Sequence, residues 1–201
     1  MISGLAKSIA CFFVDNKLID SEDEEVYAYG AELLLSTVFN LIMAILIALI
    51  SGTFLQCLVF LTAFVTLRVY AGGYHADTHK GCMLTLAVVQ CLFVLIIKLM
   101  SVEISRILVP LIIAFSVAVI IKLAPVEHPN KPLSDSLKVK LREKAVMSVS
   151  IWVVFSAVCT YVFNSIFGFC SAFGMLTISV ALIAEKAKLR RNIDEKEQNP
   201  I

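Results

Sequence analysis

The chain has 201 residues, of which 59% are hydrophobic and only 16% are charged, and its formal net charge is +1. Soluble domains carry roughly 25% charged residues, so this composition excludes an ordinary soluble protein and favours an integral membrane protein. The small net charge does not indicate a nucleic-acid partner, and none is expected.

The N-terminal region, residues 1–29, is predicted to be cytoplasmic. Residues 4–19 place apolar side chains at helical spacing, which indicates a short amphipathic helix lying on the membrane. Charged residues such as Lys7 interrupt this stretch and no small-residue cleavage site follows, so it is not a secretory signal peptide. The acidic segment 20–25 predicts the start of another helix, because carboxylates in a first turn interact favourably with the helix dipole.

Six apolar runs follow, each close to the roughly 20 residues that a helix needs to cross a membrane. They cover residues 32–51, 54–71, 83–101, 104–122, 145–163 and 166–184. We therefore predict an all-α, polytopic membrane protein with six transmembrane helices bundled over 32–184. A charged cytoplasmic tail, 185–201, completes what we expect to be a single membrane domain over 1–201.

The distribution of basic residues predicts the topology, because Lys and Arg near span ends are retained in the cytoplasm. With six spans and both termini inside, every Lys and Arg lies on the inner side except Lys98 and Arg106. The polar segment 68–82 between the second and third runs is then cytoplasmic or dips into the membrane from that side.

This polar segment is the strongest candidate for a chemical site, because polar groups near lipid are costly unless they are paired or hydrated. Its notable residues are Arg68, Gly72, Gly73, His75, Asp77, His79 and Cys82. Cys82 is predicted at the N-terminus of the third span, where the helix dipole and Lys80 favour the thiolate. The remaining cysteines lie in apolar runs or on the N-terminal helix, and no disulfide framework is expected.

Two histidines compete for the role of general base. His75 precedes Cys82 by seven residues, which is about 10 Å along a straight helix, so a direct contact requires an irregular backbone. Gly72 and Gly73 provide the necessary conformational freedom. His79, three residues from Cys82, would share a helical face with it, and the spacing alone does not separate the two histidines.

Two different roles are possible for each of the other polar residues in this segment. Asp77 would orient an imidazole, or cap a helix from a solvated loop. Arg68 would bind a carboxylate or stabilise an oxyanion, or serve as a membrane-interface anchor. His75, His79 and Cys82 also have zinc-like spacing, which makes an intramembrane metalloenzyme an alternative, although no metal or cofactor is the main expectation.

Two further patterns concern partners. A proline-rich loop from residue 124 leads into a basic stretch containing Lys131, Lys138 and Lys140, which would suit an acidic peptide or anionic lipid. Gly168 and Ala172, four residues apart in the last run, form a small-residue face compatible with a homodimer.

The pattern Arg68-x3-Gly72-Gly73-x-His75-Ala76-x5-Cys82, with six spans and a Pro-Asn-Lys-Pro basic loop, resembles the AgrB family. These are membrane-embedded cysteine endopeptidases of bacterial quorum sensing. The resemblance implies a catalytic pair of His75 and Cys82, with Arg68 and the two glycines as supporting residues. His79 is not part of the family motif.

The resemblance also implies the substrate and location. The substrate would be an AgrD-type propeptide in the bacterial cell membrane, whose acidic C-terminal tail is removed to leave a cyclic thiolactone. A small membrane transporter or peptide-export scaffold is the competing interpretation. We expect almost no internal polar residues in the last four runs, which argues against a transport path.

Overall fold

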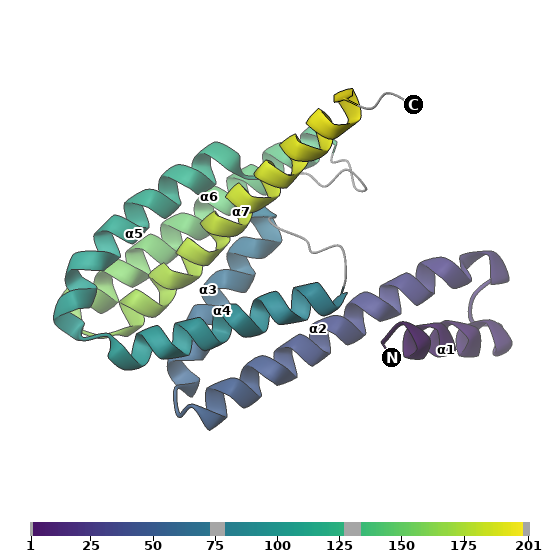
Figure 1. Ribbon diagram of the computed structural model, residues 1–201, viewed down its shortest axis with the longest axis horizontal. Coiled ribbons are helices and arrows are strands. Elements are labelled where there is room, and N and C mark those ends of the chain that lie inside the picture. Colours follow the sequence, from purple (N-terminus) through teal and green to yellow (C-terminus); the bar gives the residue numbers. More distant parts are fainter. Residues whose placement is uncertain (1, 73–78, 127–133, 199–201) are drawn as a thin grey trace. The chain divides into compact units, whose positions relative to one another are not determined.

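The computed structural model describes residues 2–72, 79–126 and 134–198, and the described residues confirm the all-α prediction (Figure 1). Their helices are α1 (Ile2–Asp15), α2 (Glu24–Ile50), α3 (Phe54–Ala71), α4 (His79–Leu99), α5 (Val102–Leu123), α6 (Asp135–Ala157) and α7 (Phe167–Gln198). The chain divides into two compact units. One comprises Met1–Gly52 and Ala76–Gln90, and the other comprises Thr53–His75 and Cys91–Ile201. A single membrane domain stays a prediction.

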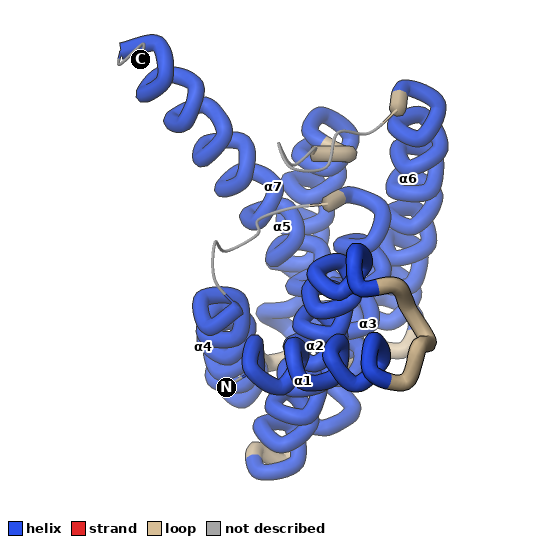
Figure 2. Tube along the Cα trace, turned by 90° about the vertical axis from the view of Figure 1, so that its right-hand side faces the viewer, coloured by secondary structure: helices blue, strands red, loops and turns tan. Residues whose placement is uncertain are grey.

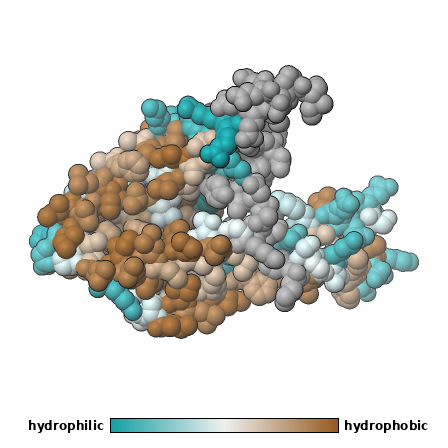
Figure 3. Space-filling view, in the orientation of Figure 1, coloured by the Kyte–Doolittle hydropathy of each residue, from teal (hydrophilic) through white to brown (hydrophobic). Residues whose placement is uncertain are grey.

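Five helices of the described chain are long and apolar enough to cross a membrane, namely α2, α3, α5, α6 and α7, so the protein is a multi-pass membrane protein. Figure 3 shows hydrophobic residues along α5 with hydrophilic residues near its ends. The expected third span corresponds to a shorter apolar stretch of α4, Met83–Leu99. Helix α4 ends at Leu99, two residues before the predicted end of the third span. The reason is that Ser101 caps α5, where its side chain accepts a hydrogen bond from the Ile104 N–H at 3.3 Å. The sixth crossing stays a prediction.

In the first unit, α1 folds back against α2 (Figure 2). Ala6 and Ala10 are buried, and the Phe13 and Tyr27 rings meet edge to face with their centroids 6.5 Å apart. The amphipathic helix ends at Asp15 rather than residue 19, because Lys17 adopts a left-handed backbone conformation with φ 54°. Packing against α2 thus uses the small side chains of α1.

In the second unit, α7 packs against α3, α5 and α6. A buried cluster joins the C-terminal ends of α3 and α5 to the middle of α6 and to α7, and its members are Leu67, Ala71, Ile120, Ala124, Ala145, Val149, Met175, Ile178 and Leu182. At the opposite end, the Tyr161 hydroxyl donates to the Arg106 carbonyl at 2.9 Å. Helices α3, α5 and α7 therefore run in one direction and α6 in the other, so Gly72 and Ala124 lie at the same end of the unit.

Two glycines of α7, the helix that packs against α3, α5 and α6, allow it to approach its neighbours closely. A Cβ atom at Gly174 would lie 2.9 Å from both the Phe60 carbonyl oxygen and the Ala63 Cβ atom. A Cβ at Gly168 would overlap the Thr160 hydroxyl, and Ala172 is fully buried. Gly168 and Ala172 are thus used inside the chain and give no support to a homodimer, which stays a prediction.

The last two spans are joined by a turn that begins with a π-helical segment, Val158–Val162. The Phe163 N–H donates to the Val158 carbonyl at 3.1 Å, and the Ser165 N–H reaches the Cys159 carbonyl at 2.8 Å. Asn164 has a φ of 48°, a left-handed conformation that lets the chain reverse direction within a few residues.

We predict that Gly174→Ala lowers the free energy of unfolding, because the added methyl group must displace the α3 backbone, at a cost of about 1–3 kcal/mol. Denaturant titration of the detergent-solubilised protein measures this change. Gly30→Ala is the matched control, because Gly30 lies inside α2 and a Cβ atom added there would have no other atom within 4 Å. The control should be neutral or stabilising by up to ~1 kcal/mol. Equal effects at both positions would contradict the close-packing explanation.

Candidate active site

Cys82 is the fourth residue of α4, which confirms the prediction that it lies at a helix N-terminus. The first N–H groups of a helix have no partner within the helix and favour a nearby negative charge. His75, Asp77, Gly73 and Lys131 lie outside the described residues, as do the side chains of His79 and Cys82. The choice between His75 and His79, the orienting role of Asp77 and the metal alternative therefore stay predictions.

The chain segment that leads to His75 is described as far as Gly72, where α3 ends. The Gly72 N–H donates to the Arg68 carbonyl at 3.1 Å, and the Arg68 Nη1 atom lies 3.4 Å from the Gly72 carbonyl oxygen. Gly72 has φ 76° and ψ −145°, a conformation that is essentially restricted to glycine. The helix therefore ends at Gly72, and the irregular backbone predicted between His75 and Cys82 stays a prediction.

Gly72 also contacts the start of the proline-rich loop. The Val126 N–H donates to the Ala71 carbonyl at 3.1 Å, and a Cβ atom on Gly72 would lie 2.8 Å from the Val126 carbonyl oxygen. The two polar loops singled out in the sequence therefore begin side by side. Their wide separation along the chain gave no indication of this contact.

Several cations at this end have local partners. The Arg142 Nη2 atom lies 3.4 Å from the Ile121 carbonyl oxygen in the last turn of α5, and the Lys144 Nζ atom lies 5.8 Å from the centre of the Tyr70 ring. Basic groups stabilise helix C-termini by interacting with exposed carbonyls. Lys138 and Lys140 lie in the first turns of α6, where Lys140 is exposed. Part of this basic rim, which comprises Lys138, Lys140, Arg142 and Lys144, thus caps helix ends.

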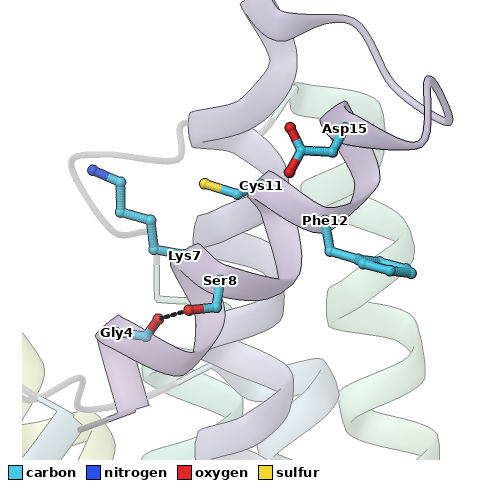
Figure 4. A pocket seen from close by; sticks show the side chains of 6 residues that line it. All are labelled: Gly4, Lys7, Ser8, Cys11, Phe12 and Asp15. Atoms are coloured by element: carbon cyan, nitrogen blue, oxygen red, sulfur yellow. Dashed lines mark hydrogen bonds between the residues drawn. The ribbon is translucent and has the colours of Figure 1, made fainter.

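The five cysteines with described side chains differ from an activated nucleophile. Cys57, Cys159 and Cys170 are buried, and Cys91 lies on an apolar surface of α4. The Cys11 thiol donates to the Glu24 carboxylate at 3.2 Å, and this hydrogen bond raises the pKa of the thiol. A surface groove beside it is lined by α1 residues alone, including Lys7 and Asp15 (Figure 4). The neighbouring carboxylate therefore disfavours the Cys11 thiolate, which is the reactive species.

The expectation of almost no polar residues inside the last four runs is wrong. The buried polar residues of these helices include Gln90, Ser105, Ser116, Ser148, Ser156, Thr160, Ser171 and Ser179. Several of the hydroxyls bond within their own helix, as Ser179 does to the Met175 carbonyl at 2.9 Å, whereas the Ser156 hydroxyl donates to the Gly168 carbonyl of α7 at 2.6 Å.

Two buried polar residues, Gln90 and Glu185, were not predicted from the sequence. Gln90 is fully buried, and its side-chain amide has no hydrogen-bond partner among the described atoms. Glu185 on α7 is only 2% exposed. Its spacing from Leu182 and Ile178 in the buried cluster was the available signal, because residues three and seven apart share a helical face.

Comparison with known proteins agrees with the sequence pattern. The family model for accessory gene regulator B, AgrB, matches residues 6–183. A "Putative AgrB-like protein 2" of Clostridium perfringens strain 13 is 27% identical over 154 residues, covering 74% of this chain and 72% of that protein. A "Putative AgrB-like protein" of C. perfringens strain SM101 is 28% identical over the same shares. No solved structure gives a significant match.

We predict that Glu24→Gln increases the rate of Cys11 alkylation severalfold near pH 8. The substitution keeps a hydrogen-bond acceptor but removes the charge that raises the Cys11 pKa, so the pKa falls and more thiolate is present at a given pH below it. Mass spectrometry of the Cys11 peptide after timed iodoacetamide treatment measures the rate. Asp15→Asn is the control, because Asp15 has the smallest influence on this thiol. An unchanged rate in Glu24→Gln would contradict the assignment.

Proposed function

Because the chain belongs to the AgrB family of membrane peptidases, which process AgrD propeptides in quorum sensing, we propose that it is a cysteine endopeptidase with Cys82 as nucleophile. His75 is the proposed general acid and base, and the substrate is an AgrD-like propeptide. The observation that carries the proposal is the position of Cys82 in the first turn of α4, within a motif of the family's order and spacing.

The surroundings of the cysteines favour this choice of nucleophile. A thiol at a helix N-terminus ionises more readily than a free thiol, and the thiolate is the reactive species. By contrast, Cys11 faces a carboxylate, and the three buried cysteines are shielded from a substrate. Cys82 is thus the thiol whose backbone position best suits nucleophilic attack.

The proposed reaction has two acyl-transfer steps. The Cys82 sulfur attacks the carbonyl carbon of the scissile peptide bond, the C–N bond breaks, and His75 gives a proton to the departing amine of the C-terminal tail. A thioester to Cys82 results. A thiol of the substrate then loses its proton to His75 and attacks the thioester, which releases Cys82 and forms the thiolactone. Exchange of one thioester for another is nearly isoenergetic, so the second step preserves the activated acyl bond formed in the first.

The site is proposed to open toward the cytoplasm. The basic rim of the second unit surrounds the end where both polar loops begin, and the cytoplasmic side of membrane proteins is rich in Lys and Arg. Both termini are then cytoplasmic, and a newly made propeptide reaches the site from the compartment in which it is synthesised. Exclusion of water by the surrounding membrane would protect the thioester from hydrolysis.

Lys131, Lys138 and Lys140 are the proposed binding surface for the acidic tail. The contact between Ala71 and Val126 supports this assignment, because it starts the proline-rich loop beside the segment that leads to His75. Lys138 and Lys140 follow in the first turns of α6 at the same end of the unit. Long-range attraction between opposite charges would steer the tail toward this end of the bundle.

We predict that Cys82→Ala, Cys82→Ser and His75→Ala each abolish cleavage of a co-expressed AgrD-like propeptide, whereas His79→Ala keeps part of the activity. The first three remove a reacting group, and His79 is not part of the family motif. Immunoblotting for the released tail measures cleavage, and mass spectrometry detects a peptide bound to Cys82. Full cleavage by Cys82→Ala, particularly with sensitivity to a chelator, would instead support a metalloenzyme.

Charge reversal of Lys131, Lys138 and Lys140 to Glu is expected to raise KM for an acidic-tailed propeptide about tenfold or more, with a smaller change in kcat. The effect should decrease at high salt, since screening weakens attraction between exposed charges. The double variant Lys98→Glu/Arg106→Glu is the control. Lys98 lies in the last turn of α4, far along the helix from Cys82, and Arg106 lies near the start of α5, far from the end that leads into the proline-rich loop. Unchanged affinity in the triple variant would contradict the docking assignment.

A further inference from the structure

Glu185 is a buried carboxylate in a membrane-embedded helix bundle, and its position needs an explanation. It lies on α7 and is 2% exposed. An ionised carboxylate removed from water is costly unless a cation or several hydrogen bonds compensate it, so such residues in membrane proteins commonly serve a function. The reaction proposed above assigns no role to it.

The helical repeat places Glu185 at the end of the bundle where the polar loops begin. Met175, Ile178 and Leu182 of α7 belong to the buried cluster that contains Ala71 and Ala124, the residues at the ends of α3 and α5. Glu185 follows Leu182 by three residues, so it continues this face by about 4.5 Å along the axis. The carboxylate is therefore carried on the face that packs toward these two helix ends.

Helix C-termini create a negative potential, which makes a carboxylate unfavourable there without a nearby cation. The candidate cations from the packed helices are Arg68, Lys122, Arg142 and Lys144, and Lys188 follows on α7 itself. Arg142 bonds to the Ile121 carbonyl, Lys144 lies over Tyr70, and Lys122 is exposed.

Arg68 is the cation best suited to this role. It is half-buried in the last turn of α3, one turn before Gly72, and its Nη1 atom faces the Gly72 carbonyl oxygen at 3.4 Å. A guanidinium has five N–H donors in a planar fork, so it can bind a carbonyl and a carboxylate at the same time. A lysine would offer one point charge without this geometry.

We propose that Glu185 is a positioning residue that holds the Arg68 guanidinium against the Gly72 carbonyl. Through Arg68 it fixes the last turn of α3 and the Gly-restricted backbone that leads to His75. Glu185 does not touch the reacting atoms. Its role deepens the proposed peptidase function and rests on it, because the geometry that it maintains is that of the general base.

The kinetic test uses the full-length protein in lipid nanodiscs with a synthetic acidic-tailed propeptide. Glu185→Gln keeps the size of the side chain and removes the charge, and it should lower kcat about tenfold or more with KM within about twofold, because small displacements of a reacting group are costly. Glu185→Asp should recover part of kcat. Arg68→Lys should lower kcat as well, and the double variant Arg68→Lys/Glu185→Gln should be no worse than the poorer single variant.

A second measurement does not depend on catalysis. Phenylglyoxal modifies accessible arginines, and peptide mapping should show Arg68 labelled severalfold faster in Glu185→Gln than in the wild type. Arg142 is the internal control, because its partner is the α5 carbonyl, and its labelling should not change. Gel filtration and denaturant titration identify any variant that fails to fold, in which case Glu185→Asp and Arg68→Lys carry the comparison.

Four outcomes would overturn the proposal, and three of them concern Glu185 and Arg68: unchanged kcat in Glu185→Gln, effects of Arg68→Lys and Glu185→Gln that multiply, or Arg68 labelling equal to the wild type. Loss of kcat in Lys188→Gln that is coupled to Glu185→Gln would assign the carboxylate to Lys188 instead and also overturn it. If the wild type does not cleave, or Cys82→Ala does, the peptidase function fails, whereas the labelling result still tests the pair.

Discussion

The close approach of α7 to α3 is the constraint on which the second unit depends. Lipid chains are as apolar as leucine, so helices in a membrane gain little from hydrophobic burial and associate mainly through van der Waals contact. Gly174 permits the α7 backbone to lie against Phe60 and Ala63, and Gly168 does the same against α6. One helix with small residues on its buried face thus contacts three neighbours, and α3 and α5 run in its direction while α6 runs opposite to it.

That common direction concentrates electrostatic features at one end of the unit. The C-termini of α3 and α5 expose carbonyl oxygens there, and the basic residues Arg68 and Arg142 lie within reach of such carbonyls. The basic rim therefore has two effects: part of it stabilises helix ends, and the rest contributes a positive field in front of the loops. Gly72 and Val126, from which the two polar loops start, are in contact at this end of the unit.

The sequence was most informative where strong breaks bound an apolar run. The span 54–71 agrees with α3 at both ends, because the segment 51–53 and Gly72 interrupt the helix. Hydropathy located the apolar part of α7 but not its end, since the charged residues after 184 are good helix formers and the helix continues to Gln198. At the site, the position of Cys82 followed from local sequence. The contact of Ala71 with Val126 depends on packing between segments that are distant in the sequence, so no local pattern predicts it. The burial of Glu185 had one sequence signal, its helical spacing from the apolar residues Leu182 and Ile178.

The π-helical segment Val158–Val162 has an evolutionary consequence. A π turn accommodates one residue more than an α turn, and such segments can be regarded as single-residue insertions absorbed within a helix. The insertion here lies just before Asn164, where the chain reverses into α7, so it rotates this turn relative to the preceding part of α6. Relatives that lack this residue would have to reverse direction from a different face of α6.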